Sequence, residues 1–438
     1  MLKTPSQSTL LFRALCLMAL ISALLAACAP TPVPQAPFKD YGYEPPASQY
    51  SGTLFKLSQD YPTLRPDMSN LPIMLATDFT QNWRAYLTQA RDYCLEGNIE
   101  ADWRVENNKV RKWYHAPWLD YGPNGREGIH GLTKEVTLAA GQLAATQTYD
   151  KAGAYAIAIY NEFGGFEIGR VWRDHNAPDP AAVADEGFPV GTVVCKALFV
   201  SMPADLMQAQ VPYLQNPLTW QAYAYDYGSK TERKVQDVAL VQMDIMVRDS
   251  RARYGWVFGT YQYNGALNNQ NPWLNLVPVG LQWGNNPEVA DNIPTLVDGK
   301  FPPNTPVTTT PINTKLTDTQ INPDKNLPPT HLGWNGRLAG PTDNPRSSCF
   351  SCHMVASYPE QPMSGAFVAA SDRPQTDPLS WGRWWMQWFQ NNPWPRQFYV
   401  VPQPKNGTDP GTRPAIFSLD FSWQLSNGIT NFYANLNK

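Results

Sequence analysis

The sequence predicts an α+β chain: a mainly antiparallel, sandwich-like β domain, followed by a C-terminal segment of short helices and long irregular loops. Runs of strand length succeed one another from about residue 75 to 290, with little helical periodicity between them. Of the 438 residues, 43% are hydrophobic, which is ample for a core, while 41 prolines and 29 glycines indicate many turns. The length exceeds that of one average domain, so we expect two units or one large unit with additions.

The first 27 residues are typical of a signal peptide. Lys3 and Arg13 give a positive start, and residues 14 to 27 carry no charge but are too few to span a membrane. The Leu-Ala-Ala-Cys that ends at Cys28 resembles the lipobox of bacterial lipoproteins. This resemblance implies cleavage before Cys28, acylation of its sulfur and anchoring to a lipid membrane. The alternative is an ordinary secretory signal, and both interpretations place the protein outside the cytoplasm, in the periplasm or at the cell exterior.

The mature chain is expected to be a soluble body on a tether. Loss of residues 1–27 leaves 32 basic and 37 acidic residues, a net charge of −5 that does not favour nucleic acid as a partner. Six prolines lie between residues 29 and 47, so we interpret residues 28–60 as the lipidated cysteine and an extended tether. Two later runs of 20 or more residues are uncharged, 206–225 and 254–287, but both contain many polar residues and prolines and are not predominantly apolar, as a spanning helix requires.

The β-rich domain is predicted over residues 61–292. Two runs flank the turn-like residues 161–165 and are expected to form a hairpin. In the run at 241–248 apolar and polar side chains alternate, with Met246 as the exception on the polar face. A turn at Asn264 and Gly265 separates the last two strands. The predicted strands are 154–160, 166–172, 192–200, 241–248, 254–263 and 277–283.

A Pro/Thr-rich linker is predicted over residues 293–330, which hold eight prolines. It leads into a C-terminal segment over residues 331–438. Here four tryptophans have the spacing of one helix face, which would either attach the segment to the β domain or form one wall of a pocket. They are Trp381, Trp384, Trp385 and Trp388.

One short motif in this segment carries specific chemistry. Cys349 and Cys352 are three positions apart and His353 follows directly. A match of this kind arises by chance in on the order of one in a thousand chains of this composition. Two thiols at this spacing add to the two vinyl groups of one haem, and the adjacent imidazole reaches its iron.

Two other interpretations of the motif fit less well. A structural zinc ion needs four ligands, and the sequence contains no second Cys-x-x-Cys and no His-x-x-x-His to complete a site. A thioredoxin-like dithiol requires a βαβ setting, but proline-rich, turn-like residues lie on both sides of the motif.

At residues 349–353 the chain resembles bacterial c-type cytochromes. The resemblance implies one covalent haem c per chain, iron ligation by His353, and one-electron transfer with redox partner proteins. Its motif fits the signal peptide, because covalent haem attachment follows export. A haem enzyme or ligand sensor with an open sixth iron position is one alternative. Another is a ligand-binding β domain served by an accessory cytochrome, and no catalytic residue is assigned.

The sixth iron ligand is the least defined part of the site. Met363 ranks first, since ten residues of chain after His353 reach about 33 Å, enough to pass round a haem edge. Met386 and then His331 follow in rank. Met354 is excluded because it adjoins His353 and cannot reach the opposite side of the ring.

Other residues have weaker signals. Cys94 and Cys195 are candidates for a disulfide in an oxidising compartment. Three histidines, namely His115, His130 and His175, lie outside any recognisable metal spacing and are interpreted as ordinary core or surface residues. An aromatic group is interpreted as core, with a sugar or ligand groove as the alternative. It consists of Trp103, Trp113, Tyr114 and Trp118.

Overall fold

A computed structural model describes most of the chain up to Trp283 and shorter stretches beyond it. The described residues are 36–283 apart from 123, 124, 230 and 253, and then 311–313, 338–343, 349–353, 356–359, 397–399 and 415–436. From Phe38 onward they belong to one compact unit. In this part of the chain, no helix has the length and apolar composition needed to cross a bilayer.

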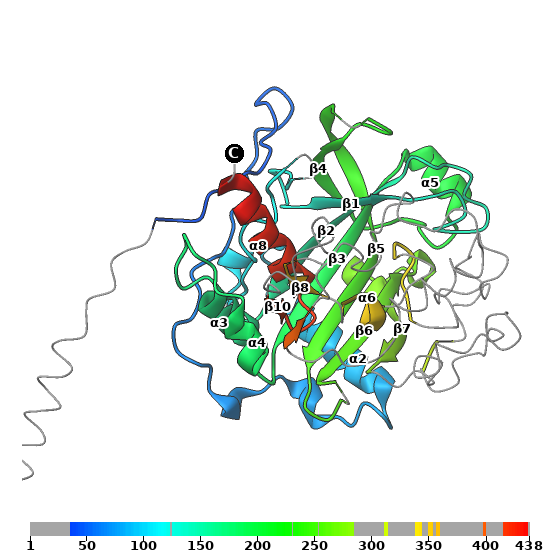
Figure 1. The fold of residues 1–438 in the computed structure, drawn as a ribbon. Coiled ribbons are helices and arrows are strands. Elements are labelled where there is room, and N and C mark those ends of the chain that lie inside the picture. The colour runs from blue at the N-terminus through cyan, green and yellow to red at the C-terminus, as the bar shows by residue number, and fades with distance from the viewer. Residues whose placement is uncertain are drawn as a thin grey trace, which may run out of the picture. The chain divides into compact units, whose positions relative to one another are not determined.

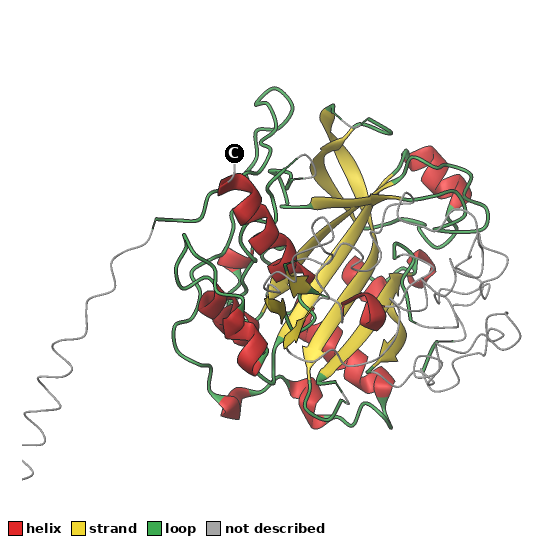
Figure 2. Cartoon of the chain, viewed as in Figure 1, coloured by secondary structure: helices red, strands yellow, loops and turns green. Residues whose placement is uncertain are grey.

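The centre of the protein is a seven-stranded antiparallel sheet (Figures 1 and 2). Its strand order is β1-β2-β3-β5-β6-β7, and β4 also pairs with the long strand β5. The strands are β1 (Thr133–Thr137), β2 (Gly153–Tyr160), β3 (Val193–Ser201), β4 (Thr219–Tyr225), β5 (Arg233–Arg248), β6 (Trp256–Tyr263) and β7 (Leu276–Gln282). A smaller sheet has the order β8-β10-β9, formed by Ser357–Tyr358, Ala415–Ser418 and Gln397–Tyr399.

Helices and short turns surround the sheets. The α-helices are α2 (Trp83–Leu95), α3 (Glu162–Val171), α4 (Ala181–Glu186), α5 (Ala204–Gln210), α6 (Cys349–His353) and α8 (Trp423–Leu436). The 3-10 turns are η1 (Met68–Asn70), η2 (Ile73–Ala76), η3 (Val105–Asn107), η4 (Gly265–Leu267) and η5 (Pro272–Asn275). The α+β class and the mainly antiparallel β domain are thus confirmed. Helix α2 packs against the apolar face of the main sheet, where a sandwich would place a second sheet.

Five of the six predicted strands are confirmed as β2, β3, β5, β6 and β7. The prediction at 166–172 was wrong, because this segment lies in helix α3. The Asn161 side chain accepts a hydrogen bond from the Gly164 amide and so caps the helix. A turn that starts with Asn and a helix capped by Asn look alike in sequence, and only the hydrogen bond distinguishes them.

The two faces of the sheet have different roles. On β5, Val241, Met243 and Ile245 lie in the main core, where side chains of helix α2 cover them. The alternate positions on β5, such as Asp244 and Met246, line a cavity on the other side. The predicted polar face of β5 therefore forms part of the cavity wall.

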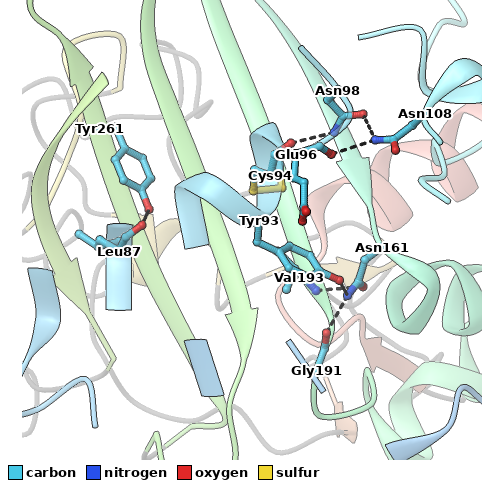
Figure 3. Close-up of a disulfide and its surroundings, with 11 residues drawn as sticks. Leu87, Tyr93, Cys94, Glu96, Asn98, Asn108, Asn161, Gly191, Val193 and Tyr261 are labelled. Carbon is cyan, nitrogen blue, oxygen red and sulfur yellow. Dashed lines mark hydrogen bonds between the residues drawn. A yellow bond between two sulfur atoms is a disulfide. The ribbon is translucent and has the colours of Figure 1, made fainter. Parts of the chain in front are cut away.

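A disulfide fastens helix α2 to the sheet (Figure 3). Cys94 near the end of α2 and Cys195 in β3 are bonded, with their Cα atoms 5.9 Å apart. Both are fully buried in the main core. The pairing that the sequence left open is therefore present. The aromatic group is core as expected, since its members are at most 5% exposed: Trp103, Trp113, Tyr114 and Trp118.

A second hydrophobic cluster holds α8 next to the cavity. Leu425, Ile429 and Phe432 of this helix are buried among residues of α3, α4 and the sheet. Gly428 permits a close approach, since a Cβ at this position would lie 2.5 Å from the Pro117 carbonyl oxygen. The helix and the sheet thus form two walls of one space.

Candidate functional site

The Cys-x-x-Cys-His motif forms the single helical turn α6. Its start is fixed to the chain before it, because the Cys349 amide donates to the Leu338 carbonyl oxygen at 3.0 Å. Neither Cys349 nor Cys352 has a disulfide partner within the described residues. Positions three apart share one side of a helical turn. Both cysteines and His353 accordingly line the same cavity.

The orientation of His353 is set from a distant part of the chain. Its Nδ1 lies 2.9 Å from the carbonyl oxygen of Phe421. A carbonyl oxygen only accepts, so Nδ1 carries the proton and Nε2 keeps its lone pair. Burial lowers the pKa of His353 to about 4, which keeps the ring neutral at pH 7. A neutral imidazole with its second nitrogen bonded to a backbone carbonyl is the arrangement that metal-binding histidines use.

The cavity has a volume of about 710 Å³, within the range of cofactor and ligand pockets. Apolar side chains of four neighbouring strands form its floor: Ala158, Val194, Met246 and Phe258. Phe421 and Trp423 also line it, and the Phe421 ring centroid lies 5.9 Å from that of Phe258. The Trp423 indole Nε1 donates to the Cys352 carbonyl oxygen at 3.0 Å, which joins α8 to the motif.

These residues fit a covalently attached haem. The two thiols can each form one thioether, and the neutral imidazole can bind iron through Nε2. Apolar and aromatic walls suit the flat, apolar macrocycle. The Phe258 ring centroid lies 5.4 Å from that of His353.

A buried polar network lies against the first cysteine. The Gln242 amide nitrogen donates to Asp244 at 2.8 Å and to Asp343 at 3.1 Å, which holds the two carboxyls together. Asp343 Oδ2 is 4.0 Å from the Cys349 sulfur, and Thr260 Oγ1 is 3.8 Å from it. Burial, with the negative charge of Asp343, raises the pKa of Asp244 to about 8. Burial likewise raises the pKa of Asp343.

One ion pair accompanies this network. Lys196 Nζ lies 2.7 Å from Glu135 Oε2. Both residues line the cavity. The sequence offered one signal for this side of the site, namely the polar alternation in β5. It offered none for Lys196 and Glu135, which the sheet brings together from β3 and β1.

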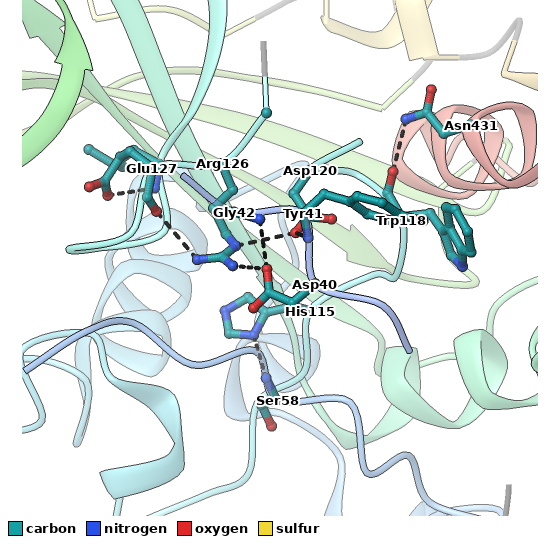
Figure 4. A network of polar contacts seen from close by, with 12 residues as sticks. Asp40, Tyr41, Gly42, Ser58, His115, Trp118, Asp120, Arg126, Glu127 and Asn431 are labelled. Atoms are coloured by element: carbon teal, nitrogen blue, oxygen red, sulfur yellow. Dashed lines mark hydrogen bonds and ion pairs between the residues drawn. The ribbon is translucent and has the colours of Figure 1, made fainter. Parts of the chain in front are cut away.

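A second polar cluster lies in the same cavity, away from the motif (Figure 4). Arg126, with 6% of its side chain exposed, pairs with Asp40 and lies 3.6 Å from Asp120. His115 is buried beside them, and its Nδ1 accepts from the Ser58 amide at 3.0 Å. Burial lowers the pKa of His115 to about 3, with a contribution from the Arg126 charge.

The structure places some of the predicted site residues and not others. It brings Cys349, Cys352 and His353 together around one cavity. His130 is elsewhere, stacked on Trp220 with ring centroids 4.5 Å apart. Several predicted positions lie outside the described residues: Cys28, the ligand candidates Met363, Met386 and His331, and the four tryptophans of 381–388.

Comparison with known proteins adds no family. Neither a family model, a curated protein nor a solved structure matches this chain.

Proposed function

We propose that this chain is a membrane-anchored c-type cytochrome that carries one covalent haem c and transfers single electrons outside the cytoplasm. The observation that carries the proposal is the contact between His353 Nδ1 and the Phe421 carbonyl at 2.9 Å. It leaves Nε2 as the one ring nitrogen able to bind a metal, in a cavity that both motif cysteines also line.

Each residue of the motif has a distinct role in this proposal. Cys349 and Cys352 would hold a haem through thioethers, and His353 and Met363 would be the ligands of its iron. A bound haem would supply a one-electron iron couple. The apolar floor and Trp423 exclude water from its faces. Redox partner proteins would dock at the membrane face to which the acylated Cys28 tethers the chain.

The buried carboxyls bear on the redox potential. Asp343 and Asp244 lie beside Cys349, so a negative charge on either would be close to the haem edge. Negative charge in a low-dielectric site stabilises the more positive, ferric state. At pH values above about 8, where Asp244 ionises, we therefore propose a lower potential than the same site would have with amides at these two positions.

Haem staining of denaturing gels tests the proposal. Cys349→Ala and Cys352→Ala should each weaken covalent attachment, and the double variant should abolish it, because each thiol forms one thioether. A control variant is Thr219→Val, at an exposed position of β4, which should leave staining intact. Full staining of the Cys349, Cys352 double variant would refute covalent haem at this site.

A haem enzyme or ligand sensor with an open sixth iron position is the second candidate. The observation in its favour is that the cavity continues beyond the motif to the cluster around Arg126. Visible spectra of the reduced protein with and without carbon monoxide separate the two candidates. Rapid carbon monoxide binding by the unaltered protein would support the open site and contradict six-coordinate electron transfer.

A further inference from the structure

We infer that the part of the cavity along helix α8 binds a small neutral molecule rich in hydroxyl groups, such as a polyol or a monosaccharide. This inference goes beyond the proposed electron transfer and does not depend on haem. It rests on three features of the cavity wall, namely a helix face of uncharged polar side chains, buried polar atoms without partners, and a cation whose charge is already matched.

Helix α8 has two different faces. While one side of α8 is buried in the second hydrophobic cluster, its other side lines the cavity. The lining side chains are three amides and a hydroxyl: Gln424, Asn427, Thr430 and Asn431. None carries a charge. From Trp423, which bonds to Cys352, to Asn431, which bonds to the Trp118 carbonyl, eight residues rise about 12 Å. The polar face therefore extends well beyond the motif.

Besides Arg126 Nε, which faces Asp120 at 3.6 Å, three polar atoms of the cavity wall are buried without a hydrogen-bond partner among the described residues. They are His115 Nε2, Gln424 Oε1 and Thr430 Oγ1. His115 is 4% exposed, and because its Nδ1 accepts from the Ser58 amide, its Nε2 carries the proton and donates. Gln424 Oε1 accepts, and a hydroxyl such as that of Thr430 does both. Each such atom left unpaired costs roughly 1–3 kcal/mol, so a ligand that pairs with all three would gain affinity.

The mixture of donors and acceptors identifies the ligand class. A hydroxyl group donates and accepts at one atom, so it can pair with each of His115, Gln424 and Thr430. A carboxylate only accepts, and an ammonium only donates. Neither could satisfy this set.

The charges in the cluster also favour a neutral ligand. The Arg126 guanidinium faces Asp40 and Asp120, so its positive charge is already paired (Figure 4). Since two carboxyls face this one cation, no positive charge is left to attract an anion. The Phe55 ring lies edge-on to His115 at 5.1 Å and also lines the cavity, which offers an apolar surface for the C–H groups of a sugar ring.

Isothermal titration calorimetry of the purified full chain, with the haem it carries, tests the inference. The neutral probes are glycerol, myo-inositol and D-glucose, and acetate and tetramethylammonium are the charged probes. We expect at least one neutral probe to bind with a Kd of about 1 mM or tighter, and neither charged probe to bind. Thr430→Val and Gln424→Met keep side-chain size but remove one partner each, and each should weaken binding about 5- to 10-fold. Thr219→Val, at an exposed position of β4, should bind like the unaltered protein.

Three results would overturn the inference. The absence of binding by every neutral probe would mean that ordered water alone satisfies these atoms. Binding of acetate in preference would assign the cluster to an anion. Unchanged affinity in both the Thr430 and the Gln424 variant would place the ligand elsewhere. Haem staining is read separately: stained protein without binding removes only this inference, and binding by unstained protein removes only the proposed cytochrome function.

Discussion

Opening the disulfide between Cys94 and Cys195 should cost a large part of the folding free energy. The bond closes a loop across a sequence separation of 101 residues. In the chain-entropy model, a loop of this length restricts the unfolded chain by about 16 cal/mol/K, which is about 4.7 kcal/mol at 25 °C. Typical domains are stable by only about 5–15 kcal/mol, so the reduced protein should be close to unfolding.

Urea unfolding at 25 °C, followed by tryptophan fluorescence, measures this loss. We expect the reduced protein to be less stable than the oxidised one by about 4–5 kcal/mol. The Cys94→Ala, Cys195→Ala variant should lose somewhat more, because deleting two buried sulfur atoms also leaves a space in the main core. A difference below about 1 kcal/mol between oxidised and reduced protein would refute the loop-entropy reasoning.

Three further predictions concern the anchor, the iron and the buried carboxyls. Cys28→Ser should move the protein from the membrane to the soluble fraction with haem staining unchanged, and retention in the membrane fraction would point to another anchor. Met363→Ala should remove any sulfur-to-iron charge-transfer band of the oxidised protein, lower the potential and admit carbon monoxide, whereas an unchanged spectrum excludes Met363. Because the folded state raises the pKa of Asp244 from 3.8 to about 8, the folded protein binds a proton that the unfolded chain releases, and its stability should fall as the pH rises from about 4 to 8. Asp244→Asn should flatten this fall in urea midpoints measured at pH 5 and pH 8, and an equally steep fall in that variant would contradict the assignment.

Sequence patterns predicted the strands well because alternation is a local property. The run at 241–248 has one apolar face, and this face lies in the main core. Residues 161–165 were predicted to be a hairpin turn. They cap and begin helix α3 instead, because Asn and Gly are common both in turns and at helix starts. The sequence could not predict that the polar face of β5 lines a cavity. The helices α6 and α8, which also line this cavity, are more than 100 residues later in the chain.

The candidate site was likewise predictable only where its residues are close in sequence. Its chemistry was visible in the spacing of Cys349, Cys352 and His353. The groups that orient and surround them are far away in sequence: the Phe421 carbonyl is 68 residues from His353, and Thr260 is 89 residues from Cys349. No local sequence pattern predicts which backbone carbonyl accepts a hydrogen bond from a histidine in the folded protein. For the same reason, the pairing of Cys94 with Cys195 required the three-dimensional structure.

The alternation of side chains in β3 also separates two kinds of sulfur chemistry. Cys195 points into the main core toward Cys94, while its neighbours Val194 and Lys196 point into the cavity that Cys349 and Cys352 line. Thiol–disulfide exchange requires direct attack of one sulfur on another. Once the sheet has formed, it stands between the two pairs of cysteines and blocks such an attack. If the chain is exported as proposed, early formation of this disulfide would keep Cys349 and Cys352 out of wrong disulfide pairs until haem is attached.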